Sequence, residues 1–419
     1  MVIVVKKGTT ILVRKMNKYL VLKSIFENGG LSQEEIHLRT HLSRPTIMEI
    51  VRELLEEDMI QKSGFGESSG GREPALFDIN EMGSFAIGVD FEYPQVNIGI
   101  LNMKREVILE RSFMLPEQMT PKEIVLRLIS HIEELMESFP YEHKKIIGIG
   151  FALPGIIDIA RGVSSRIERI DGWVDIPVVE IFEAHFEMPV YIQNDVHLLA
   201  SQEIDYRAAL SDHHFIYISI RSGIGMAIVL EDEVYQGLKG NSGFLGHLTV
   251  DVNGPQCVCG RKGCLEAVAG QLSLKKKYAK QKGVRWQDFD EVDNFYDHLY
   301  QLAQSGDEFA NELLMDACVY LAYGVANVIK ILEIPLIVLE GGLPIILDDK
   351  YSKLFSETLH HQLFENMSPE LRILSSSSNH KMIIRACSSL VFKAYIEKNY
   401  ASWTDDGKIR LMTGTYNRL

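Results

Sequence analysis

A cluster of cysteines constrains this chain more than any other feature of its sequence. Three of the five cysteines, Cys257, Cys259 and Cys264, fall within eight residues, and His247 stands ten residues before the first of them. Zinc prefers four such ligands in a tetrahedron, and three thiolates with one imidazole leave no coordination position open. Glycines between the cysteines let a short loop fold back on itself. We therefore expect a structural zinc site here, with a metal-free cysteine-rich turn as the alternative.

The composition is that of a globular protein with two or three domains. The chain has 419 residues, of which 46% are hydrophobic and 24% charged, which is ordinary for soluble proteins. No apolar run approaches the ~20 residues that span a bilayer, and the first residues lack the order of a signal peptide. An odd number of cysteines, three of them assigned to one metal, argues for a reducing compartment. We expect a cytoplasmic protein with no membrane partner.

The net charge of −14 is unevenly distributed along the chain. Residues 1–80 carry 11 Lys+Arg and 11 Asp+Glu, so this segment is neutral and the rest of the chain carries the whole acidic excess. An acidic protein is a poor general partner for nucleic acid. A neutral module on an acidic body can still bind DNA if its positive charges share one face.

Residues 1–80 have the pattern of a winged helix-turn-helix domain. Three helical patterns follow one another, and a glycine-tipped hairpin, the wing, comes after them. The second helix begins with a capping box at Ser32-Gln-Glu-Glu35, and Ser43 caps the third, with Pro45 in its first turn. The helix caps, the spacing of the helices and the wing all fit this domain. They favour DNA binding over the alternative, a small helical bundle for packing or dimerisation.

The third helix of such a domain enters the major groove of DNA. Arg44 lies in its first turn, where a bidentate arginine–guanine contact discriminates between bases by ~1–3 kcal/mol. Gly71 and Arg72 of the wing are placed to reach a phosphate or the minor groove. An N-terminal basic strip (Lys6, Lys7, Arg14, Lys15, Lys18) adds positive charge. The expected DNA contacts are Arg44, Thr46, Met48, Arg52, Gly71 and Arg72, and Glu49 shares their helix face.

From residue 84 onward the sequence has the pattern of strands and helices that is typical of an α/β protein with two lobes. Three consecutive strand patterns, an amphipathic helix and a buried strand come first, and strands and long helices recur between residues 215 and 339. Two successive α/β lobes predict a cleft between them. We expect the first lobe over residues 81–195 and the second over 196–419, with the C-terminal helix packing back on the first lobe.

Several long motifs in a fixed order resemble those of one known family. They are Ile220 to Ile228 followed by Gly243-Phe-Leu-Gly-His247, the loop from Cys257 to Glu266, and the wing Ser68 to Pro74. They are similar to the signatures of the ROK family, the repressors and sugar kinases of the actin-like ATPase superfamily. The resemblance implies an α/β chain in which a winged helix-turn-helix precedes a two-lobed actin-like ATPase fold. The wing resembles that of the family's transcriptional repressors.

The resemblance also shows where this chain departs from the family's kinases. Phosphoryl transfer needs a loop for the nucleotide phosphates, a base, and groups that orient the sugar. The family's first phosphate loop reads Asp-x-Gly-Gly-Thr, whereas this chain has Asp90-Phe-Glu92-Tyr-Pro94, and Arg221 replaces a glycine of the second loop. Lost glycines and an added carboxylate oppose phosphate binding. We therefore expect no enzymatic activity.

The family's sugar-binding groups are partly retained. Asp195 stands where the family keeps its catalytic aspartate, and here it would accept a sugar hydrogen bond, cap the following helix, or both. Arg169 replaces an asparagine and Phe244 replaces a glutamate, so a neutral hexose would lose hydrogen bonds and a sugar phosphate would gain a cation. A cleft without a small-molecule ligand is the rival interpretation. The ligand contacts that the resemblance implies are Arg169, Asn194, Asp195, His247 and Glu266.

These observations predict a DNA-binding transcriptional regulator, a repressor of carbohydrate genes with a sugar or sugar phosphate as effector. We expect a homodimer or homotetramer whose recognition helices lie ~34 Å apart on operator DNA. Effector binding in the cleft would change that spacing if one state binds it better. Two alternatives stay open: an ATP-dependent sugar kinase with an appended DNA-binding module, and a zinc-stapled interaction protein controlled by sequestration.

Overall fold

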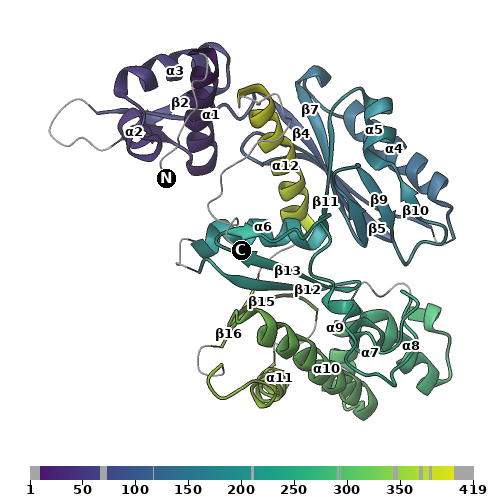
Figure 1. Cartoon of the computed structure of the whole chain (residues 1–419). Coiled ribbons are helices and arrows are strands. Elements are labelled where there is room, and N and C mark those ends of the chain that lie inside the picture. Colours follow the sequence, from purple (N-terminus) through teal and green to yellow (C-terminus); the bar gives the residue numbers. More distant parts are fainter. Residues whose placement is uncertain are drawn as a thin grey trace.

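The computed structural model shows a winged-helix module attached to a two-lobed α/β body (Figure 1). The fold class is therefore the one that the sequence predicts. The structure describes residues 10–66, 73–116, 118–208, 212–289, 292, 294–342, 348–367, 371–376 and 380–400.

The winged-helix module contains three helices and a small sheet of order β1-β3-β2. Ser32 Oγ accepts a hydrogen bond from the Glu35 amide, and the Glu35 carboxylate accepts one from the Ser32 amide, which completes the predicted capping box. Ser43 caps the third helix by accepting from the Thr46 amide. The elements are α1 (Thr10–Asn28), β1 (Leu31–Ser32), α2 (Gln33–Thr40), α3 (Arg44–Glu56), β2 (Ile60–Phe65) and β3 (Ala75–Ile79).

The first lobe is built on a five-stranded sheet of order β11-β7-β4-β5-β6. Strands β11, β7 and β4 run parallel, while β5 and β6 are antiparallel neighbours. Helices α4 and α5 cover one face. The elements are β4 (Phe85–Glu92), β5 (Gln95–Asn102), β6 (Val107–Met114), α4 (Pro121–Glu137), η1 (His143–Lys145), β7 (Ile146–Leu153), β8 (Ile156–Asp158), β9 (Val163–Arg166), β10 (Val174–Ile176), α5 (Val178–Phe186) and β11 (Val190–Asn194).

The second lobe repeats this plan with a sheet of order β14-β13-β12-β15-β16. Helices α7 to α11 pack on one face and form the largest apolar core of the molecule. The elements are α6 (Asp195–Ala208), β12 (Phe215–Ile220), β13 (Ile224–Leu230), β14 (Glu233–Val234), η2 (Leu245–His247), α7 (Leu265–Ala269), α8 (Gln271–Lys282), η3 (Trp286–Phe289), α9 (Phe295–Gln304), α10 (Glu308–Leu332), β15 (Leu336–Gly341), α11 (Asp349–Gln362), β16 (Arg372–Ser375) and, returning to the first lobe, α12 (His380–Tyr400).

Helices α6 and α12 lie between the two sheets (Figure 1). Helix α12 approaches the first-lobe sheet so closely that a Cβ atom at Gly88 or Gly150 would collide with the carbonyl oxygens of Ile384 and Cys387. Only glycine allows this approach of helix backbone to strand. Helix α12, the last helix among the described residues, is thereby fixed to the first lobe.

The winged-helix module shares one apolar core with α12 and the edge of the first lobe. Phe26 of α1 meets Phe392 of α12 edge to face, with 6.3 Å between ring centroids. The guanidinium of Arg105 lies 5.6 Å above the Phe26 ring. Buried Ala86 and Met103 of the first lobe belong to the same core. The module is therefore packed against the body and is not joined to it by a linker alone.

Helix α10 corrects one expectation from the sequence. By length and hydropathy it is able to cross a membrane, whereas the sequence analysis found no apolar run of that size. However, 56% of its apolar window is buried inside the protein. The core helix of a globular protein passes the same test, so α10 is weak evidence for a membrane span.

Candidate functional site

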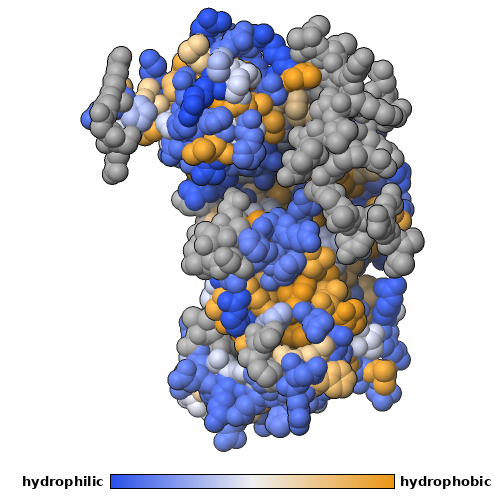
Figure 2. Space-filling model, turned by 60° about the vertical axis from the view of Figure 1, so that its left-hand side comes forward, coloured by the Kyte–Doolittle hydropathy of each residue, from blue (hydrophilic) through white to orange (hydrophobic). Residues whose placement is uncertain are grey.

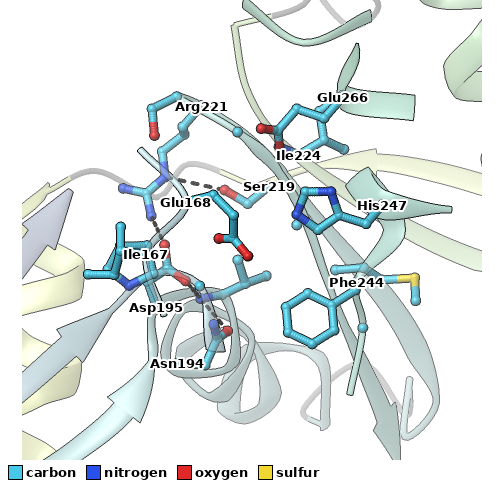
Figure 3. A pocket seen from close by; sticks show the side chains of 18 of the residues that line it. Ile167, Glu168, Asn194, Asp195, Ser219, Arg221, Ile224, Phe244, His247 and Glu266 are labelled. Atoms are coloured by element: carbon cyan, nitrogen blue, oxygen red, sulfur yellow. Dashed lines mark hydrogen bonds and ion pairs between the residues drawn. The ribbon is translucent and has the colours of Figure 1, made fainter. Parts of the chain in front are cut away.

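A cavity of about 130 Å³ lies between the lobes, at the carboxyl ends of β11 and β12 (Figure 3). The crevice at the strand ends of an open α/β sheet is the usual place for a ligand. Its size suits a monosaccharide better than a larger molecule, because pockets for drug-sized ligands measure ~300–1,000 Å³. All five ligand-binding residues expected from the sequence line it, together with Phe244: Arg169, Asn194, Asp195, His247 and Glu266.

Asn194 and Asp195 stand at the junction of β11 and α6. The Oδ1 atom of Asn194 accepts hydrogen bonds from the amides of Val196 (3.1 Å) and His197 (3.2 Å) and so caps the first turn of α6. One oxygen of Asp195 accepts from the Val196 amide at 2.9 Å, and the other faces Arg221. Capping thus occupies the Asn194 oxygen, and its amide nitrogen stays available to the cavity.

Arg221 is the electrostatic centre of the site. Its guanidinium lies 2.9 Å from Glu92, 3.7 Å from Asp195 and 3.7 Å from Glu340. It also donates to Ser219 Oγ at 3.2 Å, and Ser219 donates in turn to Glu340 at 2.5 Å. Only 16% of the Arg221 side chain is exposed. One buried cation is therefore shared among carboxylates from both lobes.

Burial shifts the acid–base properties of this cluster. Desolvation raises the pKa of Asp90 to about 7 and that of Asp195 to about 6, although the neighbouring Arg221 opposes both shifts. Asp90 accepts a hydrogen bond from Asn97 at 3.2 Å through one oxygen, and the other oxygen has no partner among the described residues. Burial alone would lower the pKa of Arg221, but the carboxylates around it, Glu92 first, raise it.

The two residues at which this chain departs from the kinase phosphate loops, Glu92 and Arg221, therefore contact each other. Glu92 stands in the place of the first loop and Arg221 in the place of the second, and they form an ion pair across the lobes. By the resemblance to the kinase loops, the guanidinium stands where that family binds a nucleotide phosphate through backbone N–H donors, and the carboxylates around it repel anions. The local geometry opposes nucleotide binding.

Two further side chains, Arg169 and Asn241, form hydrogen bonds from one lobe to the other across the cleft. Arg169 of the first lobe donates a hydrogen bond to the carbonyl oxygen of Ser222 in the second. The side-chain amide of Asn241 donates to the Ile157 carbonyl at 2.6 Å and accepts from the Ile157 amide at 2.9 Å. The cation that the sequence analysis offered to a sugar phosphate, Arg169, is thus engaged within the protein.

Glu168 is a pocket residue that the sequence analysis did not select. Its carboxylate points into the middle of the cavity, toward the space between Asp195 and His247 (Figure 3). The segment that carries it is held by buried Ile167 and Ile170 on either side. The only available signal was its position next to Arg169, because a single glutamate in a loop is usually a solvated surface residue.

The four expected metal ligands converge, and their spacing fits zinc. All four donor atoms lie within 4.8 Å of one another. The Sγ atoms of Cys259 and Cys264 are 3.7 Å apart, and Cys257 Sγ lies 3.7 Å from Nδ1 of His247. Zinc–sulfur bonds of ~2.3 Å at tetrahedral angles place two sulfurs ~3.8 Å apart. The His-Cys₃ cluster can therefore hold a tetrahedral metal ion.

His247 belongs to both the metal cluster and the cavity wall. Its Nδ1 atom faces the thiols, and the ring also lines the cavity. A metal on one imidazole nitrogen fixes the tautomer, so that the other nitrogen carries the proton. Glu266, two residues after Cys264, accepts from the Ile224 amide at 3.2 Å. His247 therefore links the cluster to the cavity, while the Ile224 amide holds Glu266 at the cavity wall.

The recognition helix α3 exposes most of the residues expected to contact DNA. Arg44, Met48 and Arg52 are between 61% and 69% exposed, counting side chains for the arginines. Thr46 is half-buried and its hydroxyl pairs with Ser43 at 2.8 Å. Figure 2 brings this module forward and shows a mostly hydrophilic surface, with an apolar patch below it on the body. Gly71 and Arg72 of the wing lie outside the described residues.

Some charges near α3 are arranged differently from the expectation. Arg44 forms a two-fold ion pair with Glu34 of α2, with both N–O distances 2.7 Å. Arg14 contacts Glu49 and Glu53. The basic strip expected from the sequence is thus partly neutralised within the module, where Lys18 also pairs with Glu53 of α3 and with Glu57, which follows it, and Glu49 contacts Arg14 of α1. Lys6 and Lys7 lie outside the described residues.

Comparison with known proteins finds two matching family models and several relatives that are named as repressors. The model of the ROK family matches residues 86–393, and that of a winged helix-turn-helix DNA-binding domain matches residues 17–61. The chain is 29% identical over 391 residues to a putative xylose repressor of Caldicellulosiruptor sp. strain Rt8B.4, covering 92% of this chain and 97% of that protein. It is 28% identical over 393 residues to the xylose repressor of Bacillus subtilis strain 168, with the same coverage.

A solved structure shares the fold over nearly the whole chain. It is the crystal structure of a ROK family transcriptional regulator, described as a homologue of the Escherichia coli Mlc protein. The TM-score is 0.73 at 20% identity, and the match covers 93% of this chain and 99% of that one. The arrangement of a winged-helix module on two lobes is thus shared as a fold.

Proposed function

Because this chain belongs to the ROK family, we propose that it is a DNA-binding transcriptional repressor of genes for carbohydrate uptake or catabolism. The observation that carries the proposal is the winged helix-turn-helix, whose α3 presents Arg44, Met48 and Arg52 to solvent. Relatives named as xylose repressors, matched over almost their full length, support the same conclusion.

In this proposal Arg44 exchanges Glu34 for a base edge when DNA binds. The guanidinium is already held in a flat two-fold geometry, which is the geometry of a bidentate contact to guanine. Thr46, Met48 and Arg52 contact bases or phosphates alongside it, and Gly71 and Arg72 of the wing remain proposed contacts to a phosphate or the minor groove. A homodimer would place two such helices on a pseudo-palindromic operator.

The interlobe cavity is the proposed effector site, for a sugar. Glu266 and Asp195 accept hydrogen bonds from hydroxyl groups, and Asn194 and His247 donate. A structural zinc in the His-Cys₃ cluster holds His247 and the loop that carries Glu266, and it supplies no chemistry of its own. We place the protein in the cytoplasm, where reduced thiols and operator DNA occur together.

Helix α12 provides a mechanical connection between the effector site and the DNA-binding module. Its first half, with Ile383 and Cys387, packs between the lobes, and its second half, with Phe392 and Ile396, lies in the core of the winged-helix module. A ligand that prefers one lobe angle shifts α12 and therefore the position of α3. This coupling needs no contact between ligand and DNA.

An ATP-dependent sugar kinase is the alternative, and one observation favours it. Burial raises the pKa of Asp195 to about 6, which suits a general base. The ion pair between Glu92 and Arg221 opposes it, because it occupies the phosphate position. ATP turnover over a panel of hexoses and amino sugars, abolished by Asp195→Asn, would establish the kinase and remove the need for a sensor.

The repressor proposal is tested by electrophoretic mobility shift with upstream genomic DNA and random DNA of equal length. Wild type should bind its operator at least ~10³-fold more tightly than random DNA. Arg44→Ala should lose ~5- to 150-fold in operator affinity, equivalent to ~1–3 kcal/mol, with little change on random DNA. Arg161→Ala, an exposed arginine of the first lobe, is the matched control. Equal affinity of wild type for both DNAs would refute the proposal.

A further inference from the structure

We propose that Glu168 selects the effector by charge, so that the pocket accepts free sugars and rejects phosphorylated ones. This inference rests on the proposed function, because it assumes that the interlobe cavity is the effector site. It assigns a specificity-determining role to a residue that no sequence motif contains.

The positive charges of the cavity wall are held by contacts within the protein. Its wall contains two arginines, and both are engaged within the protein: Arg221 with Glu92 and Asp195, and Arg169 with the Ser222 carbonyl. No lysine among the described residues lines the cavity. The Ser222 carbonyl holds Arg169 but leaves its positive charge, so two arginines face four carboxylates among the described residues of the wall, and the formal charge around the ligand is negative.

Carboxylates of the cavity wall are available to the ligand. Glu168 forms no hydrogen bond or ion pair with another described residue, and Figure 3 shows its carboxylate in the middle of the cavity. Glu266 uses one oxygen for the Ile224 amide. Two carboxylates are thus open to the ligand, and their oxygens accept hydrogen bonds only. Hydroxyl groups satisfy them, and a phosphate dianion repels them.

The rigidity of the segment that carries Glu168 supports a role in selection. Ile167 and Ile170 are buried, and the Ile170 amide donates to the Ile167 carbonyl at 3.1 Å. Trp173 is 2% exposed and its indole donates to Ser164 Oγ at 2.8 Å. The carboxylate is thus anchored on both sides, and turning it away from a phosphate would require this packing to change.

The size of the expected selectivity follows from the repulsion between the Glu168 carboxylate and a phosphate charge at close range. A carboxylate and one phosphate charge ~7 Å apart in a site of effective dielectric ~20–40 repel each other enough to weaken binding ~8- to 50-fold. Glutamine has the same shape and can still accept one hydrogen bond without the charge. Glu168→Gln should therefore admit the phosphorylated ligand and weaken the free sugar ~5- to 10-fold, since a charge-assisted hydrogen bond becomes a neutral one.

The test measures dissociation constants by calorimetry for the full-length protein with paired probes. The pairs are D-glucose and glucose 6-phosphate, and N-acetylglucosamine and its 6-phosphate, with D-xylose as a pentose. Glu180→Gln is the matched control, because Glu180 is an exposed carboxylate of the same lobe outside the cavity. Thermal unfolding of each variant and its binding to operator DNA are recorded alongside.

The expected result is that wild type binds at least one free sugar, binds its phosphate ~10-fold or more weakly, and loses most of this preference in Glu168→Gln but not in Glu180→Gln. Tighter binding of a sugar phosphate by wild type, or a preference unchanged in Glu168→Gln, overturns the inference. If no probe binds while operator DNA still binds, the role of Glu168 falls and the repressor function stands. If operator DNA does not bind either, the proposed function itself falls.

Discussion

Replacement of Arg221 with alanine should destabilise the protein, and more strongly at pH 8 than at pH 5. The Arg221 side chain is 16% exposed, and its guanidinium lies within 4 Å of Glu92, Asp195 and Glu340. Removing one partner of a buried ion pair costs ~3–5 kcal/mol, and the partial exposure places this case at the lower end, ~3 kcal/mol. For a cooperative unit of ~150–250 residues this lowers the melting temperature by ~6–12 °C.

The pH dependence follows from two aspartates whose pKa values are higher in the folded state than in the unfolded state. The pKa of Asp195 is about 6 and that of Asp90 about 7, against 3.8 for an ordinary aspartate. The folded state therefore binds more protons, and the stability they contribute is present below pH ~4 and lost as pH rises to ~7. Without Arg221, which holds both pKa values down, the loss continues to higher pH. The difference from wild type should grow between pH 5 and pH 8.

Differential scanning fluorimetry of the full-length variants from pH 5 to pH 8 measures this effect. Arg372→Ala is the control, because its ion pair with Asp212 involves an exposed arginine of the same lobe and should contribute less than ~1 kcal/mol. Adding Glu92→Gln to Arg221→Ala should restore part of the stability, since it removes one of the stranded charges. A destabilisation of equal size at pH 5 and pH 8, with no rescue by Glu92→Gln, would refute the electrostatic account.

Three further predictions concern other parts of the molecule. Glu34→Gln should raise DNA affinity a few-fold in a mobility shift, because it releases Arg44 from a surface pair worth ~0.2–1 kcal/mol; unchanged affinity would mean that Arg44 does not contact DNA. Phe392→Ala should cost ~3–5 kcal/mol in calorimetric unfolding and abolish the effect of a bound sugar on operator affinity while operator binding persists; a retained effect would exclude α12 as the connection. Cys264→Ser should reduce metal content below one zinc per chain by elemental analysis and lower the melting temperature, and full zinc content would contradict the proposed ligand set.

Local features of the fold were predictable because short-range interactions create them. The capping box at Ser32 and the cap at Ser43 were read from residue spacing, and the structure forms both. The winged-helix and two-lobed classes followed from hydrophobic periodicity and from the family motifs. The cysteine spacing anticipated a cluster able to hold a metal, since a loop of that length brings its own ligands together.

The partners of individual charged side chains were not predictable in the same way. The sequence marked Glu92 and Arg221 as departures from a phosphate loop, but it did not show that they contact each other, because 129 residues separate them. It offered Arg169 to an anionic ligand, and the structure engages it with a backbone carbonyl. It passed over Glu168, which has no neighbouring motif and gains its place in the cavity only from the packing of the loop around it.

The sequence by itself determined the helix caps at Ser32 and Ser43, the order of the modules and a cysteine–histidine cluster that can hold a metal. The caps and the cluster depend on residues close together in the chain. The tertiary structure alone decided that Arg221 neutralises carboxylates of both lobes, and that α12 joins the body to the winged-helix module. Ion pairs and core contacts of this kind depend on distances in space between segments far apart in the chain. Periodicity and spacing carry no information about those distances.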